Sequence, residues 1–108
     1  MQTHGKSPVP DFSSFAEFYP FYLKEHSRRG TRVLHFYGTA FGLFLGLIAL
    51  YTFRLRFAVL GIVGAYAMAW IGHFFIEKNR PATFRYPLYS FMGDWRLFYE
   101  ILIGKQRF

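Results

Sequence analysis

Two long stretches without a charged side chain dominate the hydrophobic pattern of this chain. Residues 36–53 and residues 57–76 are 18 and 20 consecutive uncharged residues. As α-helices they would be about 27 and 30 Å long, which is enough to cross the hydrocarbon core of a bilayer. Only the tripeptide Arg54-Leu55-Arg56 separates them. The pattern therefore predicts a transmembrane helical hairpin, with spans at about residues 33–53 and 57–77.

Small residues on both predicted spans bear on how the two helices pack. On the first span, glycine recurs every four residues, at Gly38, Gly42 and Gly46. The small residues of the second span are Gly61, Gly64, Ala65 and Ala69. Small residues let helix backbones approach closely in lipid. Alternatively, glycine is simply tolerated in membrane helices, and the sequence leaves both interpretations open.

The segments that flank the hairpin predict shorter amphipathic helices at the membrane surface. Aromatic residues repeat at helical spacing after Asp11, which we expect to be the N-cap, and Pro20 is expected to bend this helix. A glycine–threonine pair predicts a helix stop and a new N-cap at Thr31, so the first span would begin near Arg32. Residues 95–104 are too few to span a bilayer and predict a second surface helix.

The chain is predicted to form one domain behind a short tail. Residues 1–10 are polar, contain proline and lack the apolar core of a signal peptide. We therefore predict a disordered tail at residues 1–10. Residues 11–108 would form a single all-α membrane domain, consisting of the hairpin and its flanking interfacial helices.

Composition and charge support a membrane location. Of the 108 residues, 53% are hydrophobic and 23% are aromatic, which is high for a soluble domain of this length. The formal charge of +7 favours anionic lipid headgroups over nucleic acid, because the basic residues are interleaved with the apolar stretches. Basic residues are also more numerous outside the hairpin than in its loop. This positive-inside bias predicts that both termini are cytoplasmic, in the inner membrane of a bacterium or the endoplasmic reticulum of a eukaryote.

Three of the four histidines lie where the ends of these predicted elements meet. His26 closes the N-terminal helix, His35 lies near the start of the first span, and His73 lies about one turn before the end of the second. Because a hairpin returns to the side it left, the three imidazoles can converge at the cytoplasmic face. Glu77 lies four residues after His73, a spacing that lets a carboxylate orient or join an imidazole at a metal. The fourth histidine, His4, lies in the predicted tail and is excluded.

This set of side chains predicts a metal site. The chain has no cysteine, which excludes disulfides, thiolate metal sites and cysteine nucleophiles. Imidazole and carboxylate ligands suit iron and zinc, and a facial set with open positions suits Fe(II) and dioxygen. Two alternatives stay open. His35 and His73 could ligate a haem from antiparallel helices, or the histidines could be interfacial or helix-end residues of a non-enzymatic membrane scaffold.

Other polar residues near the end of the hairpin have two interpretations each. Asp94 could add a ligand to the metal, although a Gly-Asp pair before a helix is more often an N-cap. Arg80 and Arg85, together with Asn79, could hold a substrate carboxylate, which arginine binds in a bidentate manner. The same residues could equally anchor the chain at the basic membrane face.

Two blocks of the sequence resemble a known family. The first is FAEFYPFYLKEHSRRGTRVLHFYG, which contains His26 and His35. The second is WIGHFFIEKNRPATFRYPLYSFMGDWRLFYEILIGK, which contains His73 in the motif GHxxxEKxxPA. Together, over residues 15–105, they are similar to the 2-hydroxy fatty acid dioxygenases typified by the fungal enzyme of phytosphingosine breakdown, and especially to the short bacterial members of that family.

The resemblance implies a membrane-embedded, Fe(II)-dependent dioxygenase that shortens a 2-hydroxy fatty acid by one carbon. It implies His26, His35 and His73 as the iron ligands. The expected partners are the 2-hydroxy fatty acid, dioxygen and membrane lipid, with Arg80 or Arg85 drawing the carboxylate toward the metal. The small body also suggests that a homo-oligomer could complete or shield the site.

Overall fold

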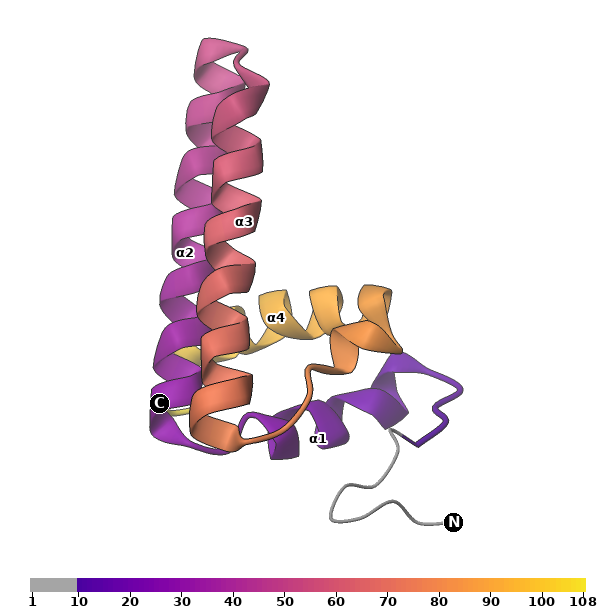
Figure 1. Ribbon diagram of the computed structural model, residues 1–108. Coiled ribbons are helices and arrows are strands. Elements are labelled where there is room, and N and C mark those ends of the chain that lie inside the picture. Colours follow the sequence, from indigo (N-terminus) through magenta and orange to yellow (C-terminus); the bar gives the residue numbers. More distant parts are fainter. Residues whose placement is uncertain (1–9) are drawn as a thin grey trace.

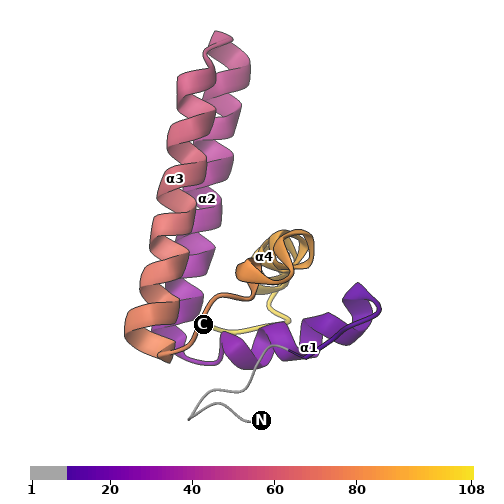
Figure 2. The same ribbon diagram turned by 45° about the vertical axis from the view of Figure 1, so that its right-hand side comes forward.

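A helical hairpin with two shorter helices beside its lower part forms the described part of the molecule, which comprises residues 10–108 of a computed structural model. In chain order the elements are α1 (Phe15–Glu25), α2 (Arg29–Thr52), α3 (Leu55–Ile71), the π-helix η1 (Gly72–Glu77), the 3-10 helix η2 (Ala82–Phe84) and α4 (Pro87–Leu102). α2 and α3 run side by side, and α1 and α4 project to one side of their lower part (Figures 1 and 2). The predicted all-α hairpin with flanking helices is confirmed. The predicted tail lies, except for residue 10, outside the described residues.

The two arms of the hairpin are long and apolar enough to cross a bilayer. They are Arg29–Thr52, with 24 residues, and Leu55–Glu77, with 23 residues, in which α3 continues into η1. The first arm begins earlier than predicted because Arg28 is its N-cap. The helix stop and N-cap predicted at Thr31 are therefore wrong. Thr31 is fully buried, and a Cβ placed on Gly72 would lie 3.2 Å from its side chain, so this threonine packs where η1 meets α2.

Small residues set the spacing of the two arms over most of their length. A Cβ on Gly38 would lie 3.1 Å from the backbone oxygen of Ala65, and a Cβ on Gly61 would lie 3.2 Å from that of Gly42. These positions confirm the close-packing interpretation. At Gly46 the other interpretation holds, because no atom lies within 4 Å of a Cβ placed there.

α1 begins at a capping box, not at Asp11. The hydroxyl of Ser14 accepts a hydrogen bond from the backbone N–H of Glu17 at 3.2 Å, and the Glu17 carboxylate accepts one from the N–H of Ser13 at 3.1 Å. The first bond satisfies an N–H group that a helix start leaves free, and the second ties the residue before the N-cap to the first turn, in a variant of the capping box. Asp11 pairs with Arg85 instead. The predicted N-cap is therefore wrong by three residues.

The core beside the lower part of the hairpin is formed between α1 and α4. Phe18, Tyr19 and Tyr22 of α1 are buried against Leu97 of α4. The Tyr19 hydroxyl donates a hydrogen bond to the buried Glu100 carboxylate at 2.8 Å. The aromatic face of α1 is thus covered by α4, which fixes α1 beside the base of the hairpin.

α4 begins eight residues before the predicted surface helix. Pro87 occupies its first turn, where the missing N–H of proline costs no hydrogen bond. Gly93 and Asp94 consequently lie in the middle of the helix, and the N-cap interpretation of Asp94 is wrong. Gly93 is needed there for a different reason, since a Cβ on it would lie 2.7 Å from the ring of Tyr22.

Candidate metal centre

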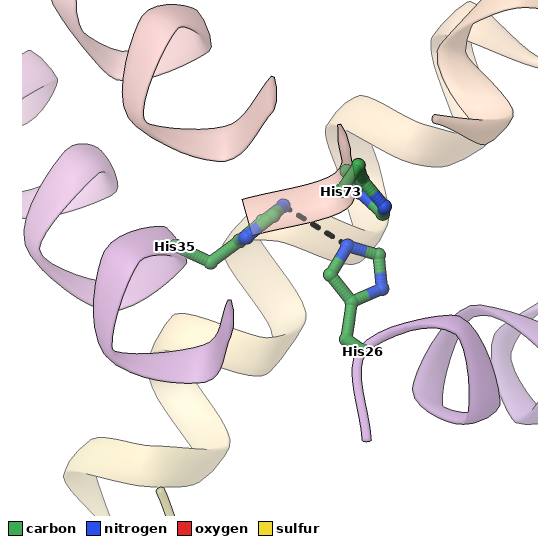
Figure 3. A group of neighbouring side chains, drawn as sticks. All are labelled: His26, His35 and His73. Atoms are coloured by element: carbon green, nitrogen blue, oxygen red, sulfur yellow. Dashed lines mark hydrogen bonds between the residues drawn. The ribbon is translucent and has the colours of Figure 1, made fainter. Parts of the chain in front are cut away.

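Three separate elements bring His26, His35 and His73 together at the lower end of the hairpin. His26 is the C-cap of α1, His35 lies in α2 and His73 lies in η1 (Figure 3). All three are buried, with exposed fractions of 2%, 5% and 3%. Each offers one ring nitrogen to a set in which all members lie within 4.8 Å of one another. The convergence expected from the hairpin topology is therefore present.

The outer nitrogen of each ring is held by an oxygen acceptor. His26 Nδ1 lies 2.6 Å from the carbonyl oxygen of Tyr22, and His35 Nδ1 lies 3.1 Å from that of Thr31. His73 Nδ1 lies 2.7 Å from Asn79 Oδ1. Because these oxygens accept hydrogen bonds, each Nδ1 carries the ring proton and each Nε2 keeps its lone pair.

The amide orientation of Asn79 is fixed independently of the histidine. Its Nδ2 donates a hydrogen bond to the carbonyl oxygen of Glu25 at 3.2 Å, so its oxygen must be the atom that faces His73. Asn79 thus ties η1 to the end of α1. The sequence drew attention to Asn79 only as a carboxylate binder, and its role beside His73 was missed.

The Nε2 atoms of His26 and His35 repel each other unless a cation lies between them. His26 Nε2 and His35 Nε2 lie 2.9 Å apart, and with both protons on Nδ1 two lone pairs face each other. Burial, followed by the proximity of His35 and His73, lowers the pKa of His26 well below its ordinary value, so adding a proton is unfavourable. Adjacent ligands at about 2.1 Å from one metal ion are separated by about 3 Å. The donor set therefore fits a metal ion held by His26, His35 and His73.

The space between the rings admits a single ion or water. The cavity lined by the three histidines has a volume of about 10 Å³, roughly the minimum for one water molecule. The rings of His35 and His73 have centroids 5.2 Å apart, and that of His26 lies 4.2 and 4.4 Å from them. A porphyrin has no room between these rings, so the haem alternative does not fit the site.

Asp94 borders the same cavity and is oriented by a tyrosine. Its Oδ1 lies 3.9 Å from His35 Nε2 and accepts a hydrogen bond from the Tyr22 hydroxyl at 2.5 Å. Burial raises the pKa of Asp94 to about 7, although the Tyr22 hydrogen bond acts in the opposite direction. The Tyr22 ring also stacks on His26, with centroids 3.9 Å apart. Tyr22 therefore connects one imidazole to the one carboxylate beside the cluster. Its only signal in the sequence was its position one turn before His26.

The comparison with known families agrees with this geometry. Residues 12–106 match the family described as 2-hydroxy-palmitic acid dioxygenase Mpo1-like. The chain belongs to the Mpo1-like family. The match includes all three clustered histidines and every described helix, so the resemblance drawn from two sequence blocks is confirmed. No curated protein and no solved structure matches the chain significantly.

In this Mpo1-like chain the Glu77 carboxylate is hydrogen-bonded to the start of α2. Its carboxylate accepts hydrogen bonds from the backbone N–H of Arg28 at 2.6 Å and from the Ser27 hydroxyl at 3.3 Å. Such an acceptor satisfies a free N–H at a helix start. The four-residue spacing from His73 assumed an α-helix, whereas η1 is a π-helix with a different register. Glu77 lies outside the three-histidine set.

The two arginines expected to attract the substrate lie away from the histidine cavity of the Mpo1-like site. Arg85 pairs with Asp11 near the start of α1. The guanidinium of Arg80 lies 5.2 Å from the ring centroid of Phe84. Neither arginine lines the cavity. In this arrangement both act as anchors for neighbouring segments.

One further polar residue of the Mpo1-like site was missed from the sequence. Ser90 lies one turn before Asp94 on α4 and lines the histidine cavity. Its hydroxyl is buried and has no hydrogen-bond partner among the described residues. No local pattern distinguishes it from an ordinary helical serine, since its position depends on how α4 docks against the hairpin.

Proposed function

We propose that this protein is a membrane-embedded, Fe(II)-dependent dioxygenase that shortens a 2-hydroxy fatty acid by one carbon. The observation that carries the proposal is the set of three buried imidazoles, each with its Nδ1 held by an oxygen acceptor and each with one ring nitrogen within 4.8 Å of the others. Such a set accepts several divalent metals, and the choice of iron follows from the dioxygenase description of the family. When bound, Fe(II) would supply dioxygen activation and open positions for the hydroxyl and carboxylate of the acid.

The chain itself contributes positioning and exclusion of water. His26, His35 and His73 would hold the metal, and the acceptors on their Nδ1 atoms keep the rings from rotating. Asp94 is our candidate for an additional ligand, because the Tyr22 hydroxyl directs its carboxylate toward the cluster. The small, buried cavity leaves little room for bulk water beside the reacting groups.

We infer that the hairpin spans the membrane with the metal centre near the cytoplasmic face. Large apolar side chains are exposed along its upper part, including Leu50 at 72%, Tyr51 at 88% and Phe53 at 93%. Exposed apolar surface on this scale is unfavourable in water and is expected where lipid covers the protein. The distribution of basic residues orients the base of the hairpin toward the cytoplasm. A membrane-dissolved acid could then reach the site from the bilayer.

The decisive experiment combines metal analysis with substrate turnover. Purified protein is loaded anaerobically with Fe(II), its iron content is measured, and 2-hydroxypalmitate is added with oxygen. We expect consumption of one dioxygen for each acid converted, with pentadecanoate, carbon dioxide and water as products. This stoichiometry balances the loss of the carboxyl carbon as carbon dioxide.

Alanine variants of the clustered histidines and of His4 test whether iron binding and turnover depend on the cluster. His26→Ala, His35→Ala and His73→Ala should each lose iron and turnover, whereas His4→Ala should retain both. Iron-loaded protein that binds 2-hydroxypalmitate but consumes no oxygen would refute the dioxygenase and preserve the metal site. Protein that takes up no transition metal, and is unaffected by all three substitutions, would favour the scaffold alternative.

A further inference from the structure

A second and larger cavity opens beside the metal centre. It has a volume of about 230 Å³ and lies between α2, α3 and α4. Both ribbon views show α4 passing beside the lower part of the hairpin and leaving the upper part uncovered (Figures 1 and 2). The lining residues run from His35 near the base to Gly42 and Ile62 about halfway along the arms, and we call this cavity the hairpin groove.

The hairpin groove is continuous with the histidine cavity. Four residues line both spaces: His35, Tyr66, Ala69 and Asp94. This shared end is polar and contains one of the proposed metal ligands. Anything that occupies the groove therefore has one end within reach of the metal centre.

With increasing distance from the metal centre, the residues that line the groove become smaller and apolar. From His35 the groove passes Thr39 and reaches Gly42, seven residues further along α2, which corresponds to about 10 Å. On α3 the matching positions are Gly61 and Ile62. At its far end the groove is therefore lined by the closely packed backbones of Gly42 and Gly61 and by the side chain of Ile62.

α4 supplies an aromatic wall that leaves the groove open on one side. Phe91 and Trp95 line it and remain 49% and 38% exposed. In a bilayer this open side would face lipid hydrocarbon. A chain longer than the groove could leave through it without entering water.

We propose that the hairpin groove binds the alkyl tail of the substrate, and that contacts along it as far as Gly42 and Ile62 favour long acids over short ones. The inference rests on the proposed function for the identity of the headgroup. A polar end at the metal, an apolar run of helix faces and an opening to lipid match a single unbranched acyl chain. The hydroxyl and carboxylate occupy the shared polar end, and the tail lies between the two helices.

Two pairs of variants test the far end of the groove. Gly42→Leu fills it, and Gly46→Leu makes the same change one turn further along, where no atom lies within 4 Å of the new Cβ. A Cβ on Gly42 makes an ordinary contact with α3, 3.5 Å from the backbone oxygen of Gly61, so a thermal unfolding curve of Gly42→Leu must first show that the α2–α3 contact is intact. Ile62→Phe and Val63→Phe form the second pair. These adjacent residues have similar exposure, 59% and 60%, but only Ile62 lines the groove.

The first readout is chain-length selectivity. For each variant, kcat/KM is measured with 2-hydroxybutyrate and with 2-hydroxypalmitate. Gly42→Leu and Ile62→Phe should lower the ratio of the long to the short acid by about tenfold or more, as expected when apolar contacts are lost from a binding pocket. Gly46→Leu and Val63→Phe should keep the ratio of the wild type. Equal ratios in all four variants would overturn the proposal.

The second readout requires no turnover. In a Trp70→Phe background Trp95 is the remaining tryptophan, and a 2-hydroxy acid brominated at mid-chain should quench its fluorescence in a saturable manner. Unbrominated 2-hydroxypalmitate should reverse the quenching, and both groove substitutions should weaken it at least tenfold in apparent affinity. Quenching by brominated phospholipid that the free acid cannot displace would assign the groove to a bilayer lipid and overturn the proposal.

The two readouts distinguish failure of the groove from failure of the enzyme. If no acid is oxidised but Trp95 quenching is saturable and sensitive to Gly42→Leu, the proposed dioxygenase fails and the acyl site stands. If 2-hydroxypalmitate is oxidised with the same selectivity in every variant, the dioxygenase stands and the groove assignment fails.

Discussion

The base and the tip of the hairpin are built on opposite principles. The buried polar residues of the described chain lie at the base: His26, Thr31, His35, His73, Ser90 and Glu100. At the tip, Leu50, Tyr51, Phe53 and Leu55 are exposed by 72% to 93%. The same two helices therefore change from a polar protein interior to an apolar outer surface within a few turns.

The difference shows where side-chain identity matters most. Buried polar groups must find partners within the protein, and at the base they find them across elements far apart in sequence, as Tyr19 does with Glu100. The tip requires only continuous helix, close packing of small residues and an apolar exterior. Substitutions should consequently have specific effects on function at the base and mainly generic effects on stability at the tip.

The largest expected contrast is the response to metal. A free metal concentration of 100 times the dissociation constant should stabilise the native base by about 2.7 kcal/mol relative to states in which the histidines separate. Native-state hydrogen exchange should show this increase for amides of α1 and η1, with little change near the tip at Thr52. An equal metal-induced increase in protection in α1 and at Thr52 would mean that metal stabilises the whole chain. If the increase in α1 were still seen in His35→Ala, the metal would bind elsewhere.

A smaller effect should follow from removing the acceptor on one imidazole. Asn79→Ala deletes the partner of His73 Nδ1 and should lower metal affinity by about tenfold to a hundredfold, because such partners fix ring orientation and basicity. Asn79→Asp keeps an acceptor and should retain most of the affinity. Thr52→Ala is the matched change at the tip, where the hydroxyl donates to the Ile48 carbonyl at 2.7 Å. Competitive metal titration provides the measurement, and equal affinities for Asn79→Ala and Thr52→Ala would contradict the role of Asn79.

Much of the fold could be predicted because it depends on local pattern and simple topology. The uncharged stretches gave the two arms, and the rule that a hairpin returns to its starting side placed His26, His35 and His73 together. These arguments need no knowledge of side-chain packing. They are therefore reliable wherever a membrane-length pattern is clear.

The errors arose where tertiary contacts overrule local preference. Thr31 and Asp94 have the features of N-caps, yet both lie inside helices, where Thr31 packs against Gly72 of η1 and Asp94 accepts a hydrogen bond from Tyr22 of α1. The hydrogen bonds of Glu77 to Ser27 and Arg28 could not be read from its four-residue spacing to His73 either, because η1 is a π-helix. Ser90 carried no signal at all. The partners of the metal centre could not be predicted because they depend on docking between elements.

A substitution within the α1–α4 contact should destabilise the base without touching a metal ligand. A Cβ at Gly93 would lie 2.7 Å from the Tyr22 ring, which stacks on His26. Gly93→Ala should therefore lower the free energy of unfolding by about 1–3 kcal/mol, as is typical of overpacking, and should also weaken metal binding. At the tip, Gly46→Ala meets no neighbour and should be neutral or stabilising through helix propensity. Unfolding in detergent solution, followed with metal titration, would reveal whether the two alanine variants differ.

The smallest expected effect lies at the turn of the hairpin, where stability should change without any effect on function. Phe53 ends α2 with φ of 56°, a left-handed conformation that is unfavourable for a bulky residue. Its side chain is 93% exposed, so removing the ring costs little packing within the protein. Phe53→Gly should raise the free energy of unfolding by about 0.5–1 kcal/mol, whereas Leu50→Gly in the preceding helical turn should lower it by a similar amount. Both variants should bind metal like the wild type. If Phe53→Gly instead weakened metal binding, the tip and the base would be coupled through the hairpin, and the independence argued from their composition would be wrong.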